Sequence, residues 1–165
     1  MSPDAFPGFL LSAQPCWPAS RGHLQLRSAD PEAPPLIVPN SLGAPQDLEA
    51  LVDGALWLRR LAATPALAAV IDAELQPGVA AQGHEALAED IRRRASTVFH
   101  PVGTCRMGTD AAQSVVDARL RVHGLQRLRV IDASVFPHIT SGNTNAPTMM
   151  VAEKGADLVL QDATT

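Results

Sequence analysis

The chain has 165 residues and a formal net charge of −4, so it is long enough to bury the core of one ordinary domain. The mild acidity argues against a dedicated nucleic-acid binder, because phosphate neutralisation needs a dominant basic surface, and an aromatic content of 4% offers few stacking platforms for single strands. The two cysteines have no CxxC spacing, so they predict neither a disulfide framework nor a zinc cluster.

Targeting signals are the next class to consider. The first twenty residues contain no basic residue, so the charged region of a secretory signal is missing. The most apolar stretch, residues 61–71, is too short to span a bilayer and is interrupted by Thr64-Pro65. We therefore expect a soluble, cytoplasmic protein without a transmembrane segment.

Prolines dominate the first part of the chain, where nine of the 14 fall within residues 1–45. Because proline removes a backbone donor and restricts the residue before it, this region predicts short edge strands and turns. Residues 23–27 alternate polar and apolar side chains, as a half-buried strand does. Residues 9–11 and 36–38 are two further strand candidates.

The hydrophobic period changes to that of a helix at residue 47. One face of the predicted amphipathic helix carries Leu48, Leu51, Val52, Ala55 and Leu58. A second helix is expected over residues 64–77, from a Thr-Pro start to a Pro-Gly stop, and a third over residues 85–95. The third helix ends in three arginines, which we expect to be solvated and to favour the helix dipole.

The last third of the chain begins with the glycine-rich segment 100–108. Residues 120–124 and 128–132 then predict a pair of strands joined by a tight connection, and a helix follows residue 148. The predicted fold class is therefore α+β: a mostly antiparallel sheet with covering helices up to residue 96, then the strand pair and a C-terminal helix.

Among five histidines, His100 is the candidate for chemistry, because the proline and glycines that follow it would hold it rigidly. A zinc site would need three or four ligands, and no second cluster completes one around His100 and Cys105, so no metal is expected. A thiol nucleophile at Cys105 would need a base and an electropositive setting. A Ser-His-Asp triad stays open on residue types alone, although no GxSxG elbow is present.

Three motifs in order carry a family resemblance: HPVGTCRMG at 100–108, LRVIDASVFP at 128–137 and SGNTNAPT at 141–148. Together they resemble the C-terminal portion of the glucose-methanol-choline (GMC) oxidoreductases, and choline dehydrogenase-like members above all. Upstream, residues 20–22, 28–31 and 39–40 are similar to substrate-domain strands of that family. The resemblance covers nearly the whole chain.

The resemblance implies two active-site residues. His100 matches the catalytic base, which takes the substrate hydroxyl proton while hydride leaves the adjacent carbon for flavin N5. Asn145 matches the second position, whose side chain hydrogen-bonds the alcohol oxygen. Its place before a helix leaves a structural alternative for Asn145, an N-cap or an Asx-turn.

The resemblance also implies FAD as cofactor. Asp132 and Ala133 match a stretch that lines FAD, and Asn143, Pro147 and Thr148 lie in the segment expected near the flavin ring. The implied activity is FAD-dependent oxidation of the CH–OH group of a small, choline-like primary alcohol. The implied organisation is the C-terminal part of a substrate-binding domain over 1–96, then an active-site segment and return to the FAD-binding domain over 97–165.

One departure from the family concerns the pyrophosphate fingerprint GxGxxG, which is not found in the 165 residues. The ADP half of FAD is therefore expected to bind elsewhere, with a separate N-terminal FAD-binding chain or self-association as possible partners. The alternative function is a catalytically inactive, stand-alone remnant that acts as a binding or interaction module. For a fragment of a larger fold, we expect exposed apolar faces on the last two strands and the last helix.

Overall fold

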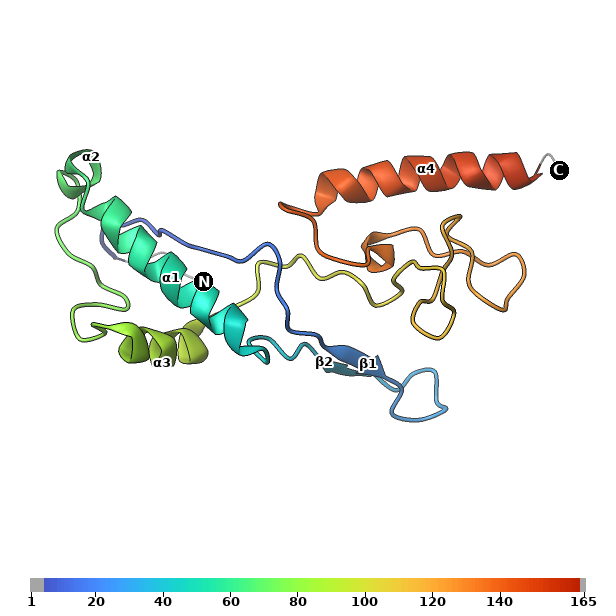
Figure 1. Cartoon of the computed structure of the whole chain (residues 1–165), viewed down its shortest axis with the longest axis horizontal. Helices are drawn as coiled ribbons and strands as arrows, with labels where there is room; N and C mark the ends of the chain where they lie inside the picture. Colours follow the sequence, from blue (N-terminus) through green and yellow to red (C-terminus); the bar gives the residue numbers. More distant parts are fainter. Residues whose placement is uncertain (1–4, 164–165) are drawn as a thin grey trace. The chain divides into compact units, whose positions relative to one another are not determined.

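The computed structural model describes residues 5–163 and divides them into two compact units (Figure 1). Unit 1 contains the described residues up to Arg21 together with Asn40–Ser96, and unit 2 contains Gly22–Pro39 and the chain from Thr97 onward. Unit 1 ends at Ser96, and residues 22–39 group with the later part of the chain. The assignment of the two parts to a substrate-binding and an FAD-binding domain stays a prediction.

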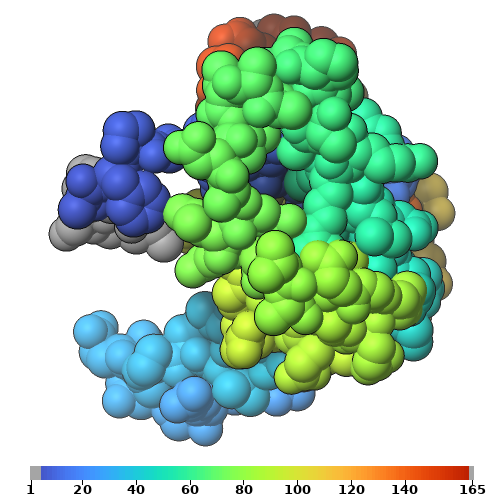
Figure 2. Space-filling view, turned by 90° about the vertical axis from the view of Figure 1, so that its left-hand side faces the viewer, coloured from blue at the N-terminus to red at the C-terminus, as the bar shows by residue number. Residues whose placement is uncertain are grey.

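Unit 1 is built on two helices, α1 (Pro45–Ala62) and α3 (His84–Arg94). They pack against each other through a small buried core of Leu48, Val52, Leu87 and Ala88. Figure 2 shows α1 in turquoise and α3 in yellow-green on one face of the molecule. The predictions of an amphipathic helix from residue 47 and of a helix over 85–95 are confirmed, since the apolar stripe of α1 faces this core.

The second predicted helix is much shorter than expected, because α2 (Pro65–Ala68) ends nine residues before Pro77. Val70, one of the residues expected to face inward, is 69% exposed, so burial does not drive further turns. The following loop is instead pinned to α1 by Arg59, which donates to the carbonyl oxygens of Ala81 at 2.9 Å and Gly78 at 3.2 Å. The strand expected at residues 9–11 is also wrong: the segment is irregular, and Leu10 is 86% exposed.

Asp47 in the first turn of α1 anchors the segment that leads into unit 2. Its buried carboxylate accepts hydrogen bonds from the backbone N–H groups of Ala19 and Ser20, both at 2.8 Å, and from the Ser20 hydroxyl. Burial alone would raise the pKa of Asp47, but the hydrogen bonds from Ser20 and Ala19 outweigh it and lower that pKa. The charge at the helix N-terminus is therefore well satisfied.

Unit 2 contains the only regular sheet among residues 5–163. The strands β1 (His23–Gln25) and β2 (Leu36–Val38) pair antiparallel, with His23 opposite Val38. This two-stranded sheet confirms the α+β class and the antiparallel pairing. It is a small ribbon, because the prolines on either side of β2 restrict further pairing.

The core of unit 2 lies between α4 (Asn145–Ala163), the short 3-10 helix η1 (Ala133–Val135) and the loops before them. Its buried residues are Val116, Leu120, Val135, Phe136 and Val151. Gly155 seats α4 on this core, because a Cβ at that position would lie only 2.5 Å from Cγ2 of Ile131. The predicted C-terminal helix is confirmed.

The expected strand pair over 120–132 exists only as a single antiparallel bridge between Arg121 and Arg129. The flanking hydrogen bonds run from Val122 N–H to the Leu128 oxygen and from Val130 N–H to the Leu120 oxygen, at 3.0 and 3.2 Å. Leu120 and Arg127 adopt φ angles of 63° and 61°. Left-handed residues interrupt an extended chain, so these arms cannot continue as regular strands.

The apolar exposure expected for a fragment is present on α4 and on the 121–129 hairpin. On α4, Met149 and Leu160 are 56% and 67% exposed, and Leu125 on the hairpin is 59% exposed. No helix within residues 5–163 combines the length and the apolar character needed to cross a membrane.

Candidate active site

His100 lies in an irregular segment that is fastened to η1 by backbone hydrogen bonds. The N–H groups of Cys105 and Met107 donate to the carbonyl oxygens of Ser134 and Val135, at 3.0 and 2.8 Å. Gly103 has a φ of +85°, which L side chains rarely adopt, and so permits the turn between His100 and this ladder. The HPVGTCRMG motif therefore holds an imidazole at a fixed place beside the core of unit 2.

Both ring nitrogens of His100 are engaged by the segment that leads into α4. Asn143 Nδ2 lies 2.9 Å from Nε2, and Thr144 Oγ1 lies 3.0 Å from Nδ1. An amide NH₂ group can only donate, so in this arrangement Nε2 carries the lone pair and Nδ1 carries the proton. His100 is then a neutral imidazole whose basic nitrogen is Nε2, capped by an amide.

Thr144 stands directly before α4, where an N-cap residue stands. Its carbonyl oxygen accepts the N–H of Thr148 at 3.0 Å and the Thr148 hydroxyl at 2.6 Å. Thr144 is only 8% exposed, the least exposed polar residue between His100 and the start of α4. The helix start is thereby tied to the imidazole.

The structure brings His100 to Asn143 rather than to Asn145. Asn145 is the first residue of α4, is exposed, and makes no side-chain hydrogen bond within residues 5–163. The structure thus places the Asn143 amide, two residues before Asn145, against Nε2 of His100, and the role expected for Asn145 stays a prediction. The sequence analysis had given Asn143 to the cofactor.

The other residues expected near a cofactor lie around the same core. Asp132 is exposed, and its carboxylate accepts the Ser134 N–H at 2.7 Å, so it caps η1. Ala133 packs against the apolar cluster, and Pro147 and Thr148 are half-buried in the first turn of α4. These contacts give Asp132 a structural role as the cap of η1, and its role toward FAD stays a prediction.

Thr144 is the site residue that the sequence analysis missed. A signal was available: Thr144 is followed three residues later by Pro147, which has no N–H to offer the hydroxyl of an N-cap residue. Of the two usual capping donors only the N–H of Ala146 remains, and the hydroxyl faces another group instead.

The remaining histidines have local partners or lie exposed. His84 lies 2.6 Å from a carboxylate oxygen of Glu49, and His123 contacts Ser114 Oγ and the Gly108 carbonyl oxygen. In the part of the chain that the structure describes, no three His, Cys, Asp or Glu side chains gather as metal ligands. Cys105 is a half-buried free thiol.

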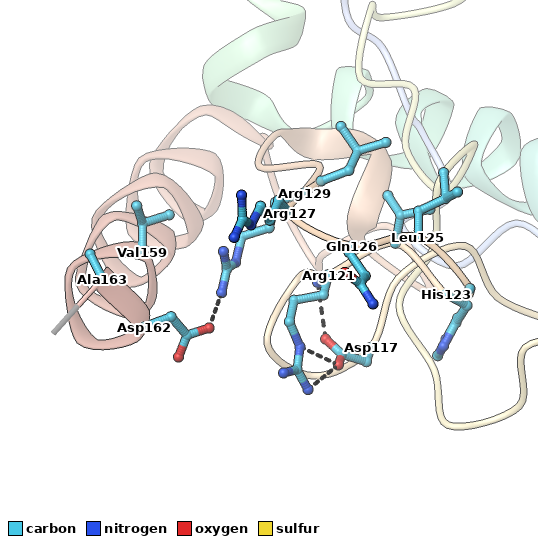
Figure 3. A pocket seen from close by; sticks show the side chains of 13 residues that line it. Asp117, Arg121, His123, Leu125, Gln126, Arg127, Arg129, Val159, Asp162 and Ala163 are labelled. Carbon is cyan, nitrogen blue, oxygen red and sulfur yellow. Dashed lines mark hydrogen bonds and ion pairs between the residues drawn. The ribbon is translucent and has the colours of Figure 1, made fainter. Parts of the chain in front are cut away.

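A hollow of about 610 Å³ lies elsewhere on unit 2, between the 121–129 hairpin and the C-terminal end of α4. Figure 3 shows Asp162 of α4 facing Arg129 and Asp117 facing Arg121. A hydrogen bond from Arg119, joined by Arg129, lowers the pKa of Asp162. These guanidinium groups are already paired with carboxylates. We therefore interpret the hollow as the space beside the ion pairs that join α4 to the hairpin. It contains none of the expected site residues.

The family model described as GMC oxidoreductase matches residues 18–152. The chain is 44% identical over 154 residues to an alcohol dehydrogenase [acceptor] of Pseudomonas putida, covering 93% of this chain and 28% of that protein. It is 46% identical over 140 residues to an oxygen-dependent choline dehydrogenase of Pseudomonas savastanoi pv. phaseolicola, covering 85% and 24%.

Among solved structures, the chain resembles a formate oxidase of Aspergillus oryzae RIB40, studied for its FAD modification. The TM-score is 0.83 at 31% identity, over 88% of this chain and 26% of that one. The chain thus spans about a quarter of the length of the relatives it matches.

Proposed function

This chain belongs to the GMC oxidoreductase family, and from that membership we propose that it supplies the base of an FAD-dependent enzyme that oxidises a small primary alcohol. The observation that carries the proposal is the imidazole of His100, whose two ring nitrogens are held by Asn143 and Thr144. A fixed neutral imidazole is suited to accept a hydroxyl proton near neutral pH.

The proposed proton acceptor is Nε2 of His100. In the structure this nitrogen faces the Asn143 amide at 2.9 Å, so an arriving alcohol must take the place of that contact. The alcohol O–H then donates to Nε2, and the Asn143 NH₂ group donates to the alcohol oxygen. As the proton leaves, negative charge grows on that oxygen, and a positioned amide donor stabilises it.

Asn143 is thus our proposed partner of His100, and it takes the role that the motif comparison gave to Asn145. The support is its direct contact with Nε2, which Asn145 lacks. Asn145, with a free side chain at the start of α4, remains a candidate for contact with the substrate or cofactor.

The residues around His100 fit the flavin end of FAD. The first N–H groups of α4, those of Asn145 and Ala146, have no acceptor within the helix, and Pro147 and Thr148 form a half-buried surface beside them. Such a helix start favours negative charge on a ring held there. When FAD is bound, its isoalloxazine ring supplies the acceptor for the hydride that leaves the alcohol carbon.

Other parts of the cofactor contact are proposed from the motifs alone. We assign Asp132 and Ala133 to the lining of FAD. The ADP half would be held by polypeptide outside these 165 residues, either a separate N-terminal FAD-binding chain or the rest of a longer one. The exposed apolar side chains of α4, such as Met150 at 58% and Leu160 at 67%, offer that polypeptide a surface to cover.

A choline-like substrate is favoured by Phe99, the residue directly before His100. Its φ of 62° is unusual for a bulky residue, and it is 81% exposed. A backbone outlier beside a proposed base is the kind of strain that functional sites retain. The exposed ring could stack on a quaternary ammonium group, which aromatic faces attract.

A cytoplasmic location belongs to the same proposal, because Cys16 and Cys105 are both free thiols.

A chimera tests the proposal. The matching segment of the P. putida alcohol dehydrogenase [acceptor] is exchanged for this chain, and alcohol-dependent bleaching of the flavin band is measured. We expect bleaching in the chimera and a loss of about 10²–10⁴-fold in its rate in H100A. H84A is the matched control, because His84 is exposed and paired with Glu49 within unit 1. A chimera that binds FAD and is bleached equally fast in H100A would refute the role of His100.

The second candidate function, a binding module without redox chemistry, is favoured by the apolar exposure of α4 and the hairpin. It differs from the first in one readout. A module would join its partner polypeptide, yet the assembled complex would bind no FAD.

A further inference from the structure

We infer that Thr144 is a positioning residue: its buried hydroxyl holds the His100 ring with Nε2 against the Asn143 amide, and the two contacts together determine which ring nitrogen is the base. This inference rests on the proposed function of His100. Thr144 itself contacts neither substrate nor cofactor in the proposal; it acts through the imidazole.

The contact that carries the inference is between Thr144 Oγ1 and His100 Nδ1, at 3.0 Å. A hydroxyl can donate or accept, so this contact alone does not fix the proton. The Asn143 amide on the other nitrogen completes the assignment, because its NH₂ group needs the lone pair of Nε2. Thr144 Oγ1 then accepts the Nδ1 proton.

The burial of Thr144 makes the contact persistent. At 8% exposure, its hydroxyl has little access to water, and a buried N–H or hydroxyl without a partner is costly. Rotation of the imidazole by half a turn would break the pair on both nitrogens at once. The ring is therefore held with Nε2 toward Asn143 and the exposed side of the segment.

Pro147 removes one of the two backbone donors that would compete for this hydroxyl. In an ordinary N-cap, the Ser or Thr oxygen accepts the N–H of the second or third helical residue. The third residue of α4 is Pro147, which has no N–H, and the N–H of Ala146, the second residue, makes no hydrogen bond to Thr144 Oγ1 within residues 5–163. The Thr144 carbonyl still accepts both the N–H and the hydroxyl of Thr148. The backbone of Thr144 is thus fixed by the helix, while its side chain serves His100.

The test is the tautomer itself, read from the ring ¹⁵N shifts of the full 165-residue chain at about pH 8.5, well above the ordinary imidazole pKa of about 6.5. In the wild type, Nε2 of His100 should show the shift of a lone-pair nitrogen and Nδ1 that of a protonated one. T144V keeps the shape but removes the hydroxyl. With the ring no longer held against the Asn143 amide, we expect the tautomer ratio to shift toward Nε2–H by about fivefold, the equivalent of one hydrogen bond of about 1 kcal/mol.

Three further variants make the result specific. T144S keeps the hydroxyl and should restore the wild-type ratio. P147A returns an N–H to the third helical position, which competes for Thr144 Oγ1 and should weaken the bias without removing any packing of Thr144. S114A is the matched control, since it removes a hydroxyl from His123 and should change only the His123 shifts.

Either of two results would overturn the inference: a wild-type His100 that carries its proton on Nε2, or a T144V spectrum with an unchanged His100 ratio. If T144V does not fold, P147A and T144S decide the question. The tautomer measurement needs no FAD and no turnover, so it stands apart from the chimera. A confirmed tautomer effect beside an inactive chimera would refute the alcohol-oxidising function and leave the role of Thr144 at His100 intact.

Discussion

Replacing Gly155 by alanine should destabilise unit 2, although alanine is the better helix former. Gly155 is buried in α4, and an added Cβ would lie 2.5 Å from Cγ2 and 2.9 Å from Cδ1 of Ile131. Helix propensity favours alanine by about 1 kcal/mol, whereas forcing a methyl group into a packed contact costs about 1–3 kcal/mol. Since 2.5 Å is far inside van der Waals contact, the upper part of that range applies, and we expect G155A to lose about 1–2 kcal/mol.

The assay is urea unfolding followed by the helical circular dichroism signal. Both tryptophans, Trp17 and Trp57, lie in unit 1, so their fluorescence gives an internal reference for that unit. A156G, at the neighbouring exposed position of α4, measures the propensity difference in the same helix and should cost about 1 kcal/mol. The steric cost of G155A is then its measured loss plus that propensity difference.

Ile131 supplies the second half of the test. Truncation to alanine removes both atoms that the new methyl group would meet, so the I131A/G155A double variant should be less destabilised than the sum of the two single variants. We expect a coupling of about 1–2 kcal/mol, as for residues in direct contact. A G155A chain more stable than the wild type, or additive effects, would refute the seating of α4 on Ile131.

Three more predictions concern charge and the proposed site. A hydrogen bond from Arg94, together with one from Arg93, lowers the pKa of Asp90 below its ordinary 3.8. The ionised Asp90 therefore stabilises the folded chain fully above pH 3.8, and this stabilisation is lost as the pH falls through the lowered pKa. In thermal melts recorded over a range of acid pH, the melting temperature of D90N should fall less steeply with decreasing pH than that of the wild type. An equally steep fall would contradict this. In the chimera, N143A should lower kcat by about 10²-fold, and a larger loss in N145A would make Asn145 the partner instead. F99A should raise KM for choline by about fivefold while leaving KM for a neutral primary alcohol unchanged; equal shifts would remove the cation contact.

The helices that could be predicted are those whose apolar stripe meets a partner. The spacing of Leu48 and Val52 predicted α1 correctly, because these side chains pack with Leu87 and Ala88 of α3. The helix predicted from the same kind of stripe over 64–77 forms only over its first turn. Val70 has no apolar surface to cover, and Arg59 holds the following loop by its carbonyl oxygens. Hydrophobic periodicity indicates which side chains a helix could bury, but the helix forms only where another part of the chain packs against that face.

The strand pair failed for a reason that residue types do not reveal. Residues 120–132 alternate as strands do, yet Leu120 and Arg127 adopt the left-handed conformation, which neither residue type favours. Leu120 is nevertheless 4% exposed in the core, so burial of its side chain accompanies the unusual backbone. Tertiary packing can impose such a conformation, and no local pattern announces it.

The candidate site could be predicted to within a turn. Motif order placed His100 and the 141–148 segment together, and the structure joins them through Nδ1 and Nε2. The choice between Asn143 and Asn145 depends on where α4 begins, since residues on either side of a helix start face in different directions. Helix boundaries are the least certain part of a sequence prediction, so the asparagine that faces the imidazole could not be selected in advance.

The seat of α4 and the state of His100 are connected through one core. Ile131 meets Gly155 on α4 and precedes η1, whose Ser134 carbonyl oxygen holds the His100 segment through Cys105 N–H. Thr144, directly before the same helix, holds the imidazole. If the methyl group of G155A pushes the helix, the Thr144–His100 distance changes and the tautomer ratio moves with it. If the Ile131 side chain yields instead, the ratio stays at its wild-type value while stability falls. The ring ¹⁵N shifts of G155A therefore tell which of the two surfaces is the stiffer, and so whether the helix or the core fixes the position of the base.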